Sequence, residues 1–376
     1  MSSLSLAFAG GGTGGHVVPG RHLLAHLRAS GADLGTLLWF GAGRPIEDRA
    51  LAGIEPELGG ARLERVALSL EPPGGGAPGL GRLALRTGPE VRRARRALQA
   101  AGSRVLVGLG GYTTLPAVLA ARSLGLPVVL LEINAAAGRA TRVLARLSTR
   151  VVHAWKSTLP ARGGERHLHL GPPLGPEFLA PGPDEAARAA GRRALGFDPV
   201  RPLLLVLGGS QGALGLNRFL REHAAGLVAG GLSVWHQVGP GRRDEAPAPA
   251  AHLRVDEYVP RVAEALGLAS LVLCRGGAST LAEVAAVGRA ALCVPYPHHA
   301  DRHQARNAAA LGEAVRVIPE ETLSAATVEE LVRLAHDAPR RHELGERLRT
   351  ALPRDGGPRL AELVLELAGA IPAPLS

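Results

Sequence analysis

The sequence predicts an α/β protein made of two doubly wound, parallel-sheet domains of the Rossmann-like kind. Within residues 4–28 an apolar run leads into a glycine cluster and then into a helix-compatible stretch, and residues 201–217 repeat that order. Short apolar runs alternate with helical stretches through both halves, which is typical of a parallel sheet covered by helices on both faces. With 376 residues, 46% of them hydrophobic, the chain is long enough for two such cores.

The first domain is predicted to span residues 1–171. Its helices are expected at residues 82–100, 115–124 and 138–147, and its strands at residues 4–10, 36–43, 104–112, 128–134 and 150–155. Residues 44–81 are less regular and contain prolines and several glycines, which predicts a mobile surface loop.

The second domain is predicted to span residues 172–354, after a proline- and glycine-rich junction near Gly171. An amphipathic helix at about residues 355–370 is expected to pack back on either domain. Cys274 and Cys293 each lie in an apolar run, which predicts two buried thiols on adjacent strands and a reducing compartment.

The formal net charge of +10 comes almost entirely from arginine, since Lys156 is the only lysine. A basic surface favours anionic partners, although heavy use of arginine also fits genome composition or thermal adaptation. The arginine-rich helix within residues 82–97 predicts either contact with an anionic membrane surface or a solvated helix face. No apolar run is long enough to span a membrane, and the N-terminal run is expected to be a strand and not a signal peptide. Aromatic residues are too scarce for stacking on bases, so no nucleic-acid partner is expected.

The first glycine loop also fits the dinucleotide-binding pattern G-x-G-x-x-G, through Gly10, Gly12 and Gly15. Such enzymes need an acidic residue at the end of the second strand, to hold the ribose hydroxyls. Here that strand ends in residues 41–44, which finish with an arginine and contain no acid. A phosphorylated dinucleotide therefore stays open, but the second nucleotide-type half has no place in that scheme.

Five ordered motifs resemble the MurG family of N-acetylglucosaminyltransferases. They are GGGTGGHVVPG, GLGGYTTLPAVLAA, LEINAAAGRATRVLAR, VLGGSQGALGLN and CRGGASTLAEVAAVGRAALCVPYPHHADRHQARNAAALGE. The resemblance implies a GT-B fold, with two Rossmann-like domains facing across a cleft. It also implies inverting transfer of N-acetylglucosamine from UDP-N-acetylglucosamine, held by the C-terminal domain, to a lipid-linked muramyl pentapeptide, held by the N-terminal domain. We therefore expect a peripheral enzyme on the cytoplasmic face of the cell membrane. No cofactor is expected, nor a structural metal, since the chain has no D-x-D motif.

Inverting transfer needs a base for the acceptor hydroxyl and groups that stabilise the leaving diphosphate. His16, at the tip of the first loop, is the predicted base, unless it only caps the turn; Glu132 is the alternative base. The Gly208–Gly212 loop is expected to donate backbone and hydroxyl hydrogen bonds to the donor diphosphate, or to be a purely structural turn.

The resemblance implies the remaining roles. Glu283 is placed on the ribose hydroxyls, Arg275 near the uracil, and Gln304 with Asp301 and Asn307 on the sugar. The full set of donor residues is Thr13, Gly14, Asn134, Ser210, Gln211, Gly212, Val259, Arg275, Ala278, Glu283 and Gln304. The acceptor diphosphate is assigned to Gly10, Gly11, Gly12, Gly15, Gly110, Gly111 and Tyr112.

The chain departs from the family pattern at six positions. These are Leu131 for His, Ile133 for Gln, Pro172 for Asn, Gly175 for Arg, Gly276 for Ser and His303 for Gln. Three alternatives stay open: a transferase of the same fold that uses another UDP-sugar or a diacylglycerol acceptor, a donor-binding scaffold with weakened catalysis, and a dinucleotide-dependent oxidoreductase.

Overall fold

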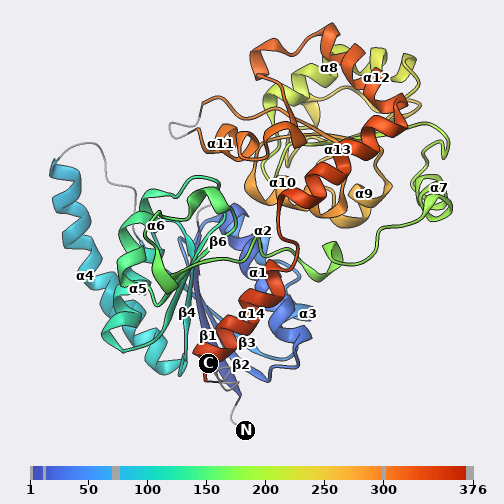
Figure 1. Ribbon diagram of the computed structural model, residues 1–376. Coiled ribbons are helices and arrows are strands. Elements are labelled where there is room, and N and C mark those ends of the chain that lie inside the picture. Colours follow the sequence, from blue (N-terminus) through green and yellow to red (C-terminus); the bar gives the residue numbers. More distant parts are fainter. Residues whose placement is uncertain (1–2, 12–13, 70–76, 299–301, 370–376) are drawn as a thin grey trace. The chain divides into compact units, whose positions relative to one another are not determined.

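A computed structural model describes residues 3–11, 14–69, 77–298 and 302–369 (Figure 1). The chain forms two compact units. Unit 1 comprises Met1–Pro176 and Pro353–Ser376, and unit 2 comprises Glu177–Leu352. The chain therefore crosses between the units twice, and its C-terminal segment returns to the unit in which the chain begins.

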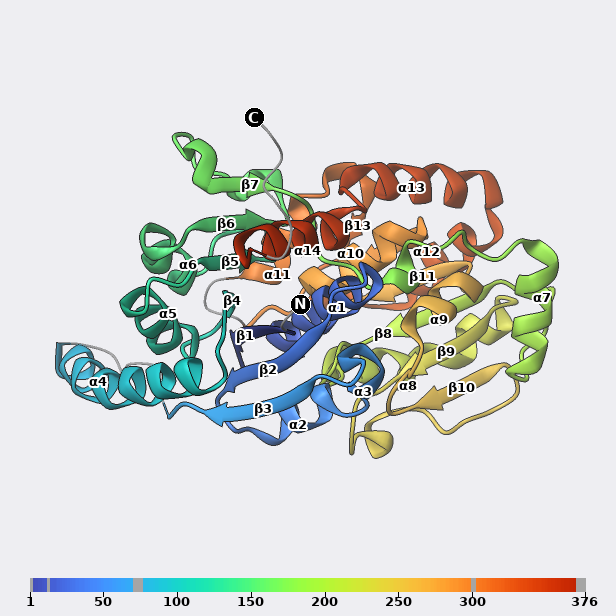
Figure 2. The same cartoon turned by 90° about the horizontal axis from the view of Figure 1, so that it is seen from below.

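Unit 1 is built on a seven-stranded parallel sheet with the order β3-β2-β1-β4-β5-β6-β7 (Figure 2). The strands are β1 (Leu4–Gly10), β2 (Leu34–Gly41), β3 (Arg62–Ala67), β4 (Leu106–Gly110), β5 (Val128–Glu132), β6 (Arg150–His153) and β7 (His167–His169). Because β1 pairs with both β2 and β4, the loops that follow these three strands emerge at one edge of the sheet.

Helices cover both faces of this sheet. They are α1 (Gly14–Ala29), α2 (Pro45–Leu51), α3 (Glu55–Leu58), α4 (Ala77–Ala100), α5 (Thr114–Ser123), α6 (Arg139–Leu144) and α14 (Gly356–Leu367). On one face, α1 packs along α14, whose Leu360 and Val364 are fully buried in the same apolar cluster as Phe8. On the other face, α4 and α5 bury Leu98 and Val118. The predicted C-terminal helix thus completes the core of unit 1.

The prediction of an irregular loop at residues 44–81 is wrong, because α2, α3, β3 and the start of α4 lie within it. The strand β3 pairs with β2 on one side only, and its sequence RLERVA carries three charged residues. Such an edge strand lacks the continuous apolar run that identifies the buried strands. The stretch 70–76 lies outside the described residues.

Unit 2 is built on a six-stranded parallel sheet with the order β10-β9-β8-β11-β12-β13. The strands are β8 (Leu203–Leu207), β9 (Ser233–Gln237), β10 (Leu253–Asp256), β11 (Leu271–Cys274), β12 (Ala291–Cys293) and β13 (Arg316–Val317). The helices are α7 (Glu185–Ala194), α8 (Leu214–Ala229), α9 (Val262–Leu268), α10 (Ala278–Val287), α11 (His303–Ala309), α12 (Ala325–His336) and α13 (Ala338–Ala351). Cys274 lies opposite Cys293 on the neighbouring strand, and both are free, buried thiols, which confirms that prediction.

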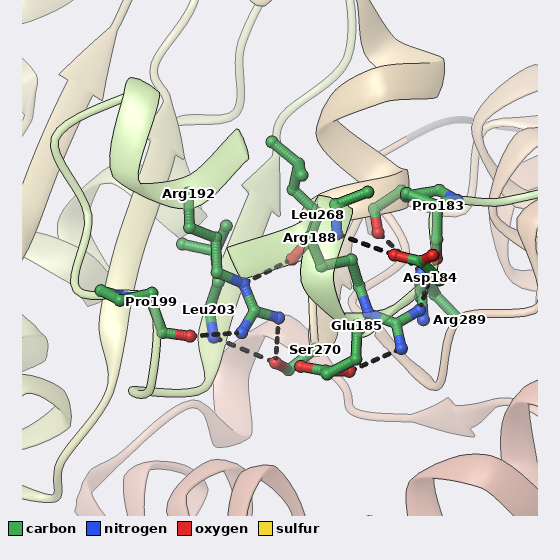
Figure 3. Close-up of polar contacts among 12 residues, drawn as sticks. Pro183, Asp184, Glu185, Arg188, Arg192, Pro199, Leu203, Leu268, Ser270 and Arg289 are labelled. Atoms are coloured by element: carbon green, nitrogen blue, oxygen red, sulfur yellow. Dashed lines mark hydrogen bonds and ion pairs between the residues drawn. The ribbon is translucent and has the colours of Figure 1, made fainter. Parts of the chain in front are cut away.

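Part of the chain's arginine content serves to hold unit 2 together (Figure 3). Arg192 donates to the Leu268 carbonyl (2.9 Å) and to Ser270 Oγ (2.9 Å). Arg289 donates to the carbonyls of Leu266 (3.0 Å) and Gly267 (2.7 Å). The two guanidinium groups thereby satisfy the last carbonyls of α9, which lack partners inside the helix. Burial lowers the pKa of Arg289 to about 10, so this cation is held at a cost and is not an exposed anion-binding charge.

Candidate active site

The first glycine loop joins β1 to α1 and carries His16 in the first turn of the helix. The Nδ1 atom of His16 lies 2.9 Å from the Gly11 carbonyl oxygen. Since a carbonyl only accepts hydrogen bonds, Nδ1 carries the proton, and Nε2 is then the nitrogen with the basic lone pair. The predicted loop residues Gly12 and Thr13 lie outside the described residues, whereas Gly14 and Gly15 begin α1.

A second pair of glycines, after β4, lies against the imidazole of His16. Gly110 and Gly111 adopt positive φ values of 102° and 85°. A Cβ on Gly110 would lie 3.2 Å from His16 Cδ2, and one on Gly111 would lie 3.3 Å from His16 Nδ1. Only glycine combines these backbone angles with so close an approach to the ring. The structure thus brings together Gly11, His16 and the glycine pair, and the adjacent Tyr112 is 42% exposed.

Side chains from neighbouring strands and helices fix this loop region. Trp39 Nε1 on β2 donates to the Gly10 carbonyl at 3.0 Å. Thr114 Oγ1 on α5 lies 3.1 Å from the Ala9 carbonyl and 2.8 Å from the Gly110 carbonyl. These contacts hold the backbone beneath His16 in one position. The sequence analysis did not single out Trp39 or Thr114.

Glu132, the alternative base, is only 3% exposed at the end of β5. Its carboxylate accepts hydrogen bonds from Gly138 N (2.8 Å), Thr141 Oγ1 (2.5 Å) and both nitrogens of Asn134 (3.0 Å for the backbone and 3.4 Å for Nδ2). Glu132 therefore fixes the loop between β5 and α6 and orients the Asn134 amide. Its two carboxylate oxygens already serve as acceptors inside the protein.

The neighbouring departures from the family pattern lie in the core of unit 1. Leu131 is 2% exposed within the apolar cluster that contains α1 and α14, and Ile133 packs against the same cluster. Because side chains alternate along an extended chain, both point away from Glu132. These two substitutions replace polar groups by core-packing ones.

The second glycine loop joins β8 to α8. Gln237, at the end of β9, accepts a hydrogen bond from Gly208 N (3.1 Å) and donates to the Gly209 carbonyl (2.9 Å). Ser210 and Gln211 are exposed, and Gly212 has a φ of 72°. The N-cap residue of α8, Ala213, makes no side-chain capping hydrogen bond, and backbone N–H groups at a helix N-terminus favour anions.

Glu283, on α10, is partly buried. Burial, and secondarily the negative charge of Glu177, raises its pKa to about 8. Among the described residues, no hydrogen bond or ion pair to this side chain is formed. A ligand with hydroxyl donors would supply hydrogen-bond partners to this carboxyl group.

The helix α11 closes over the turn that precedes α10. Asn307 Nδ2 donates to the Gly276 carbonyl at 3.0 Å, and Tyr296 N donates to Gln304 Oε1 at 2.9 Å. A Cβ on Gly276 would overlap the Gln304 carbonyl oxygen, so the serine found in the family would not fit here without movement of α11. Gln304 and Asn307 are thus placed beside the turn, while Asp301 lies outside the described residues.

Arg275 directly follows β11. It is 5% exposed, donates to the Val294 carbonyl (3.0 Å) and forms an ion pair with Glu320, whose carboxylate packs on Gly215 in the first turn of α8. Arg275 therefore ties the turn after β11 to α8. The two other predicted donor residues, Val259 and Ala278, are also buried.

In unit 2, the sequence likewise carries no signal for Gln237 and Glu320 as structural supports of the region around the second glycine loop. Each acts across the sheet on a loop more than 25 residues away in the chain, a distance at which a single sequence carries no pairing signal. In the described segments, histidine, cysteine and carboxylate side chains form no group of three arranged to hold a metal ion.

Both units of the chain match domains of a known protein family. Residues 6–153 match the N-terminal domain and residues 203–347 the C-terminal domain of glycosyltransferase family 28. The crystal structure of Acinetobacter baumannii MurG superposes with a TM-score of 0.71 at 25% identity, over 97% of this chain and 99% of that one. The fold and its two loops therefore define a glycosyltransferase of the GT-B class.

Full-length relatives narrow this class. The chain is 37% identical to the UDP-N-acetylglucosamine–N-acetylmuramyl-(pentapeptide) pyrophosphoryl-undecaprenol N-acetylglucosamine transferase of Sorangium cellulosum, over 98% of this chain and 89% of the relative. It is also 37% identical to the enzyme of the same name from Paenarthrobacter aurescens, over 98% and 97%. The chain belongs to the MurG family, which confirms the family, the fold and the enzyme class predicted from its sequence.

Proposed function

We propose that this protein transfers N-acetylglucosamine from UDP-N-acetylglucosamine to a muramyl hydroxyl of a lipid-linked muramyl pentapeptide, with inversion at the anomeric carbon. The observation that carries the proposal is the match to transferases of this name along nearly the whole chain. That match includes the glycine loops that start both units.

On the acceptor side, His16 serves as the general base. With its Nδ1 proton engaged by the Gly11 carbonyl, Nε2 takes the proton of the acceptor hydroxyl. The hydroxyl oxygen then forms a bond to the anomeric carbon of the donor sugar. The bond from that carbon to the UDP oxygen breaks, and its electron pair leaves with UDP. Backbone N–H groups of the glycine loops at the ends of β1 and β4 are proposed to bind the acceptor diphosphate.

On the donor side, unit 2 binds the nucleotide. The exposed Ser210 and Gln211 and the uncapped start of α8 hold the diphosphate and stabilise its growing negative charge. Glu283 accepts hydrogen bonds from the two ribose hydroxyls, which supplies the partners that its carboxyl group lacks. Gln304 and Asn134 recognise the sugar.

We further propose that unit 1 attaches to the cytoplasmic face of an anionic membrane through α4. The side chains of Arg92, Arg93, Arg95 and Arg96 are exposed on this helix. Each basic residue near an anionic bilayer contributes about 1 kcal/mol of binding free energy. The side chains of Arg82 and Arg86, in the same predicted basic stretch, lie outside the described set. In the segments that the structure describes, no helix has the length and apolar character needed to cross a bilayer.

A direct assay tests the reaction. The protein is incubated with labelled UDP-N-acetylglucosamine and a short-chain lipid-linked muramyl pentapeptide, with UDP-glucose and diacylglycerol as competing donor and acceptor. We expect label transfer to the muramyl lipid alone. Transfer only from UDP-glucose would show that the proposed donor is wrong, and transfer only to diacylglycerol would show that the proposed acceptor is wrong. Tight binding of a nicotinamide dinucleotide without any transfer would overturn the proposal.

A further inference from the structure

A buried glutamate that the proposed reaction does not use lies directly beneath the first glycine loop. Glu47, on α2, is 2% exposed. Its Oε1 atom accepts from Ala42 N (2.9 Å) and its Oε2 atom from Gly43 N (3.0 Å), so it binds the turn that follows β2. The sequence of the second strand contains no acid at its end, but Glu47 of α2 places a carboxylate there in the folded chain.

The same carboxylate also touches the loop that holds His16. A Cβ on Gly11 would overlap Glu47 Oε1 and lie 2.9 Å from Ala42 N, so Gly11 packs directly on this carboxylate and its donor. A Cβ on Gly41 would overlap Oε2 in the same way. Glu47 thus occupies the space between the ends of β1 and β2, where a dinucleotide enzyme would hold its ribose.

We propose that Glu47 is a positioning residue that acts on His16 through Gly11. Glu47 fixes Gly11, and the Gly11 carbonyl in turn holds the Nδ1 proton of His16, which leaves Nε2 as the basic nitrogen. This inference rests on the proposed role of His16 as the base. It assigns the buried carboxylate to orientation of the imidazole and not to nucleotide binding.

Replacement of the carboxylate by an amide should break this arrangement. In Glu47→Gln one of the two acceptor oxygens becomes an NH₂ group, which then faces the N–H of Ala42 or Gly43. Two donors cannot hydrogen-bond to each other, so the turn and the adjacent Gly11 must shift. A shift of about 1 Å at a catalytic group lowers a rate by about 100-fold.

The experiment compares wild-type protein, Glu47→Gln and the control Glu57→Gln. Glu57, on α3, pairs with Arg21 of α1 (2.6 Å). Glu57→Gln therefore removes a carboxylate that contacts α1, the helix that carries His16, without touching the glycine loop. The ¹⁵N spectrum of the histidine rings is recorded at about pH 8.5, where imidazole is neutral, and His16 is assigned from the signals lost in His16→Gln. We expect a single Nδ1–H tautomer in wild type and in Glu57→Gln, and a tautomer mixture in Glu47→Gln.

Transfer kinetics supply the second readout. In Glu47→Gln we expect kcat to fall about 100-fold while KM for UDP-N-acetylglucosamine stays unchanged. A merely structural role would leave the tautomer of the folded molecules intact. If Glu47→Gln does not fold, Gly11→Ala disturbs the same contact, because its Cβ would overlap Glu47 Oε1. The folded Gly11→Ala protein should show the same mixture of His16 tautomers.

The outcomes separate this inference from the proposed function. A single Nδ1–H tautomer in folded Glu47→Gln or Gly11→Ala overturns the positioning role, whatever the activity. A tautomer mixture with unchanged kcat supports the positioning role and rejects His16 as the base.

Discussion

The two glycine loops start from the same local order of strand, glycines and helix but are held in different ways. In unit 1 the carbonyls of Gly10 and Gly11 accept hydrogen bonds from Trp39 and His16, and Glu47 fills the space below. In unit 2 the side chain of Gln237 holds the loop through Gly208 and Gly209. Ser210 and Gln211, in the second loop, remain exposed to solvent.

Under the proposed mechanism, this difference lets one motif serve two kinds of chemistry. The first loop uses its carbonyls to fix the proton on one nitrogen of an imidazole, which is what a general base requires. The second loop keeps hydroxyl and amide groups at a helix N-terminus, which is what an anionic leaving group requires. A G-x-G pattern alone therefore does not predict which ligand group the loop meets.

The largest expected effect comes from removal of the base in the first loop. His16→Ala should lower kcat by about 10³-fold, because general base catalysis contributes about this factor. Affinity for UDP, measured by calorimetry, should stay unchanged, since the nucleotide is assigned to unit 2. The control His167→Ala changes a histidine on the edge strand β7 and should retain wild-type turnover. Full turnover of His16→Ala would place the base elsewhere and remove the proposed contrast between the loops.

Glu132 offers a test of the alternative base. Glu132→Gln puts an NH₂ group among four hydrogen-bond donors, so we expect the free energy of unfolding to fall by about 3 kcal/mol. Denaturant unfolding measures this loss, and the folded fraction should keep most of its turnover. An unchanged stability together with a loss of turnover as large as that of His16→Ala would make Glu132 the base.

The raised pKa of Glu283 predicts pH-dependent donor binding in unit 2. With a pKa of about 8, the free carboxyl group is mostly protonated at neutral pH, whereas two ribose hydroxyls donate best to its ionised form. Binding should therefore release a proton, and affinity for UDP-N-acetylglucosamine should rise about 25-fold between about pH 6.5 and 8.5. Calorimetry in two buffers of different ionisation enthalpy measures the released proton.

Two variants check the assignment of this pH dependence. Glu283→Gln should abolish both the proton release and the rise in affinity. Glu264→Gln changes an exposed glutamate of α9 that pairs with Arg261, and it should leave both unchanged. Proton release that persists in Glu283→Gln would assign the titrating group to another residue.

The sequence predicted those features that local chemistry determines. The glycine loops and the buried strands, such as β1 at residues 4–10, follow from apolar runs and from glycines. The supports of the loops did not emerge in this way. Gln237 and Glu320 reach their glycines from other strands or turns, and their partners are set by strand order. Glu47 could not be recognised from the sequence because it lies beyond the end of β2. Only the fold of the chain into α2 brings its carboxylate back to the end of that strand.

The smallest expected effect concerns a single hydroxyl of the second loop. Ser210 is exposed, so Ser210→Ala should not change the free energy of unfolding. Loss of one hydrogen bond to the donor diphosphate costs about 1 kcal/mol, which corresponds to about a fivefold weaker affinity. Because the predicted contact is to the diphosphate, UDP and UDP-N-acetylglucosamine should weaken equally while uridine binding stays the same. A loss of uridine affinity in Ser210→Ala would show that the second loop contacts the nucleoside, and the proposed division of labour between the glycine loop and Glu283 would then be wrong.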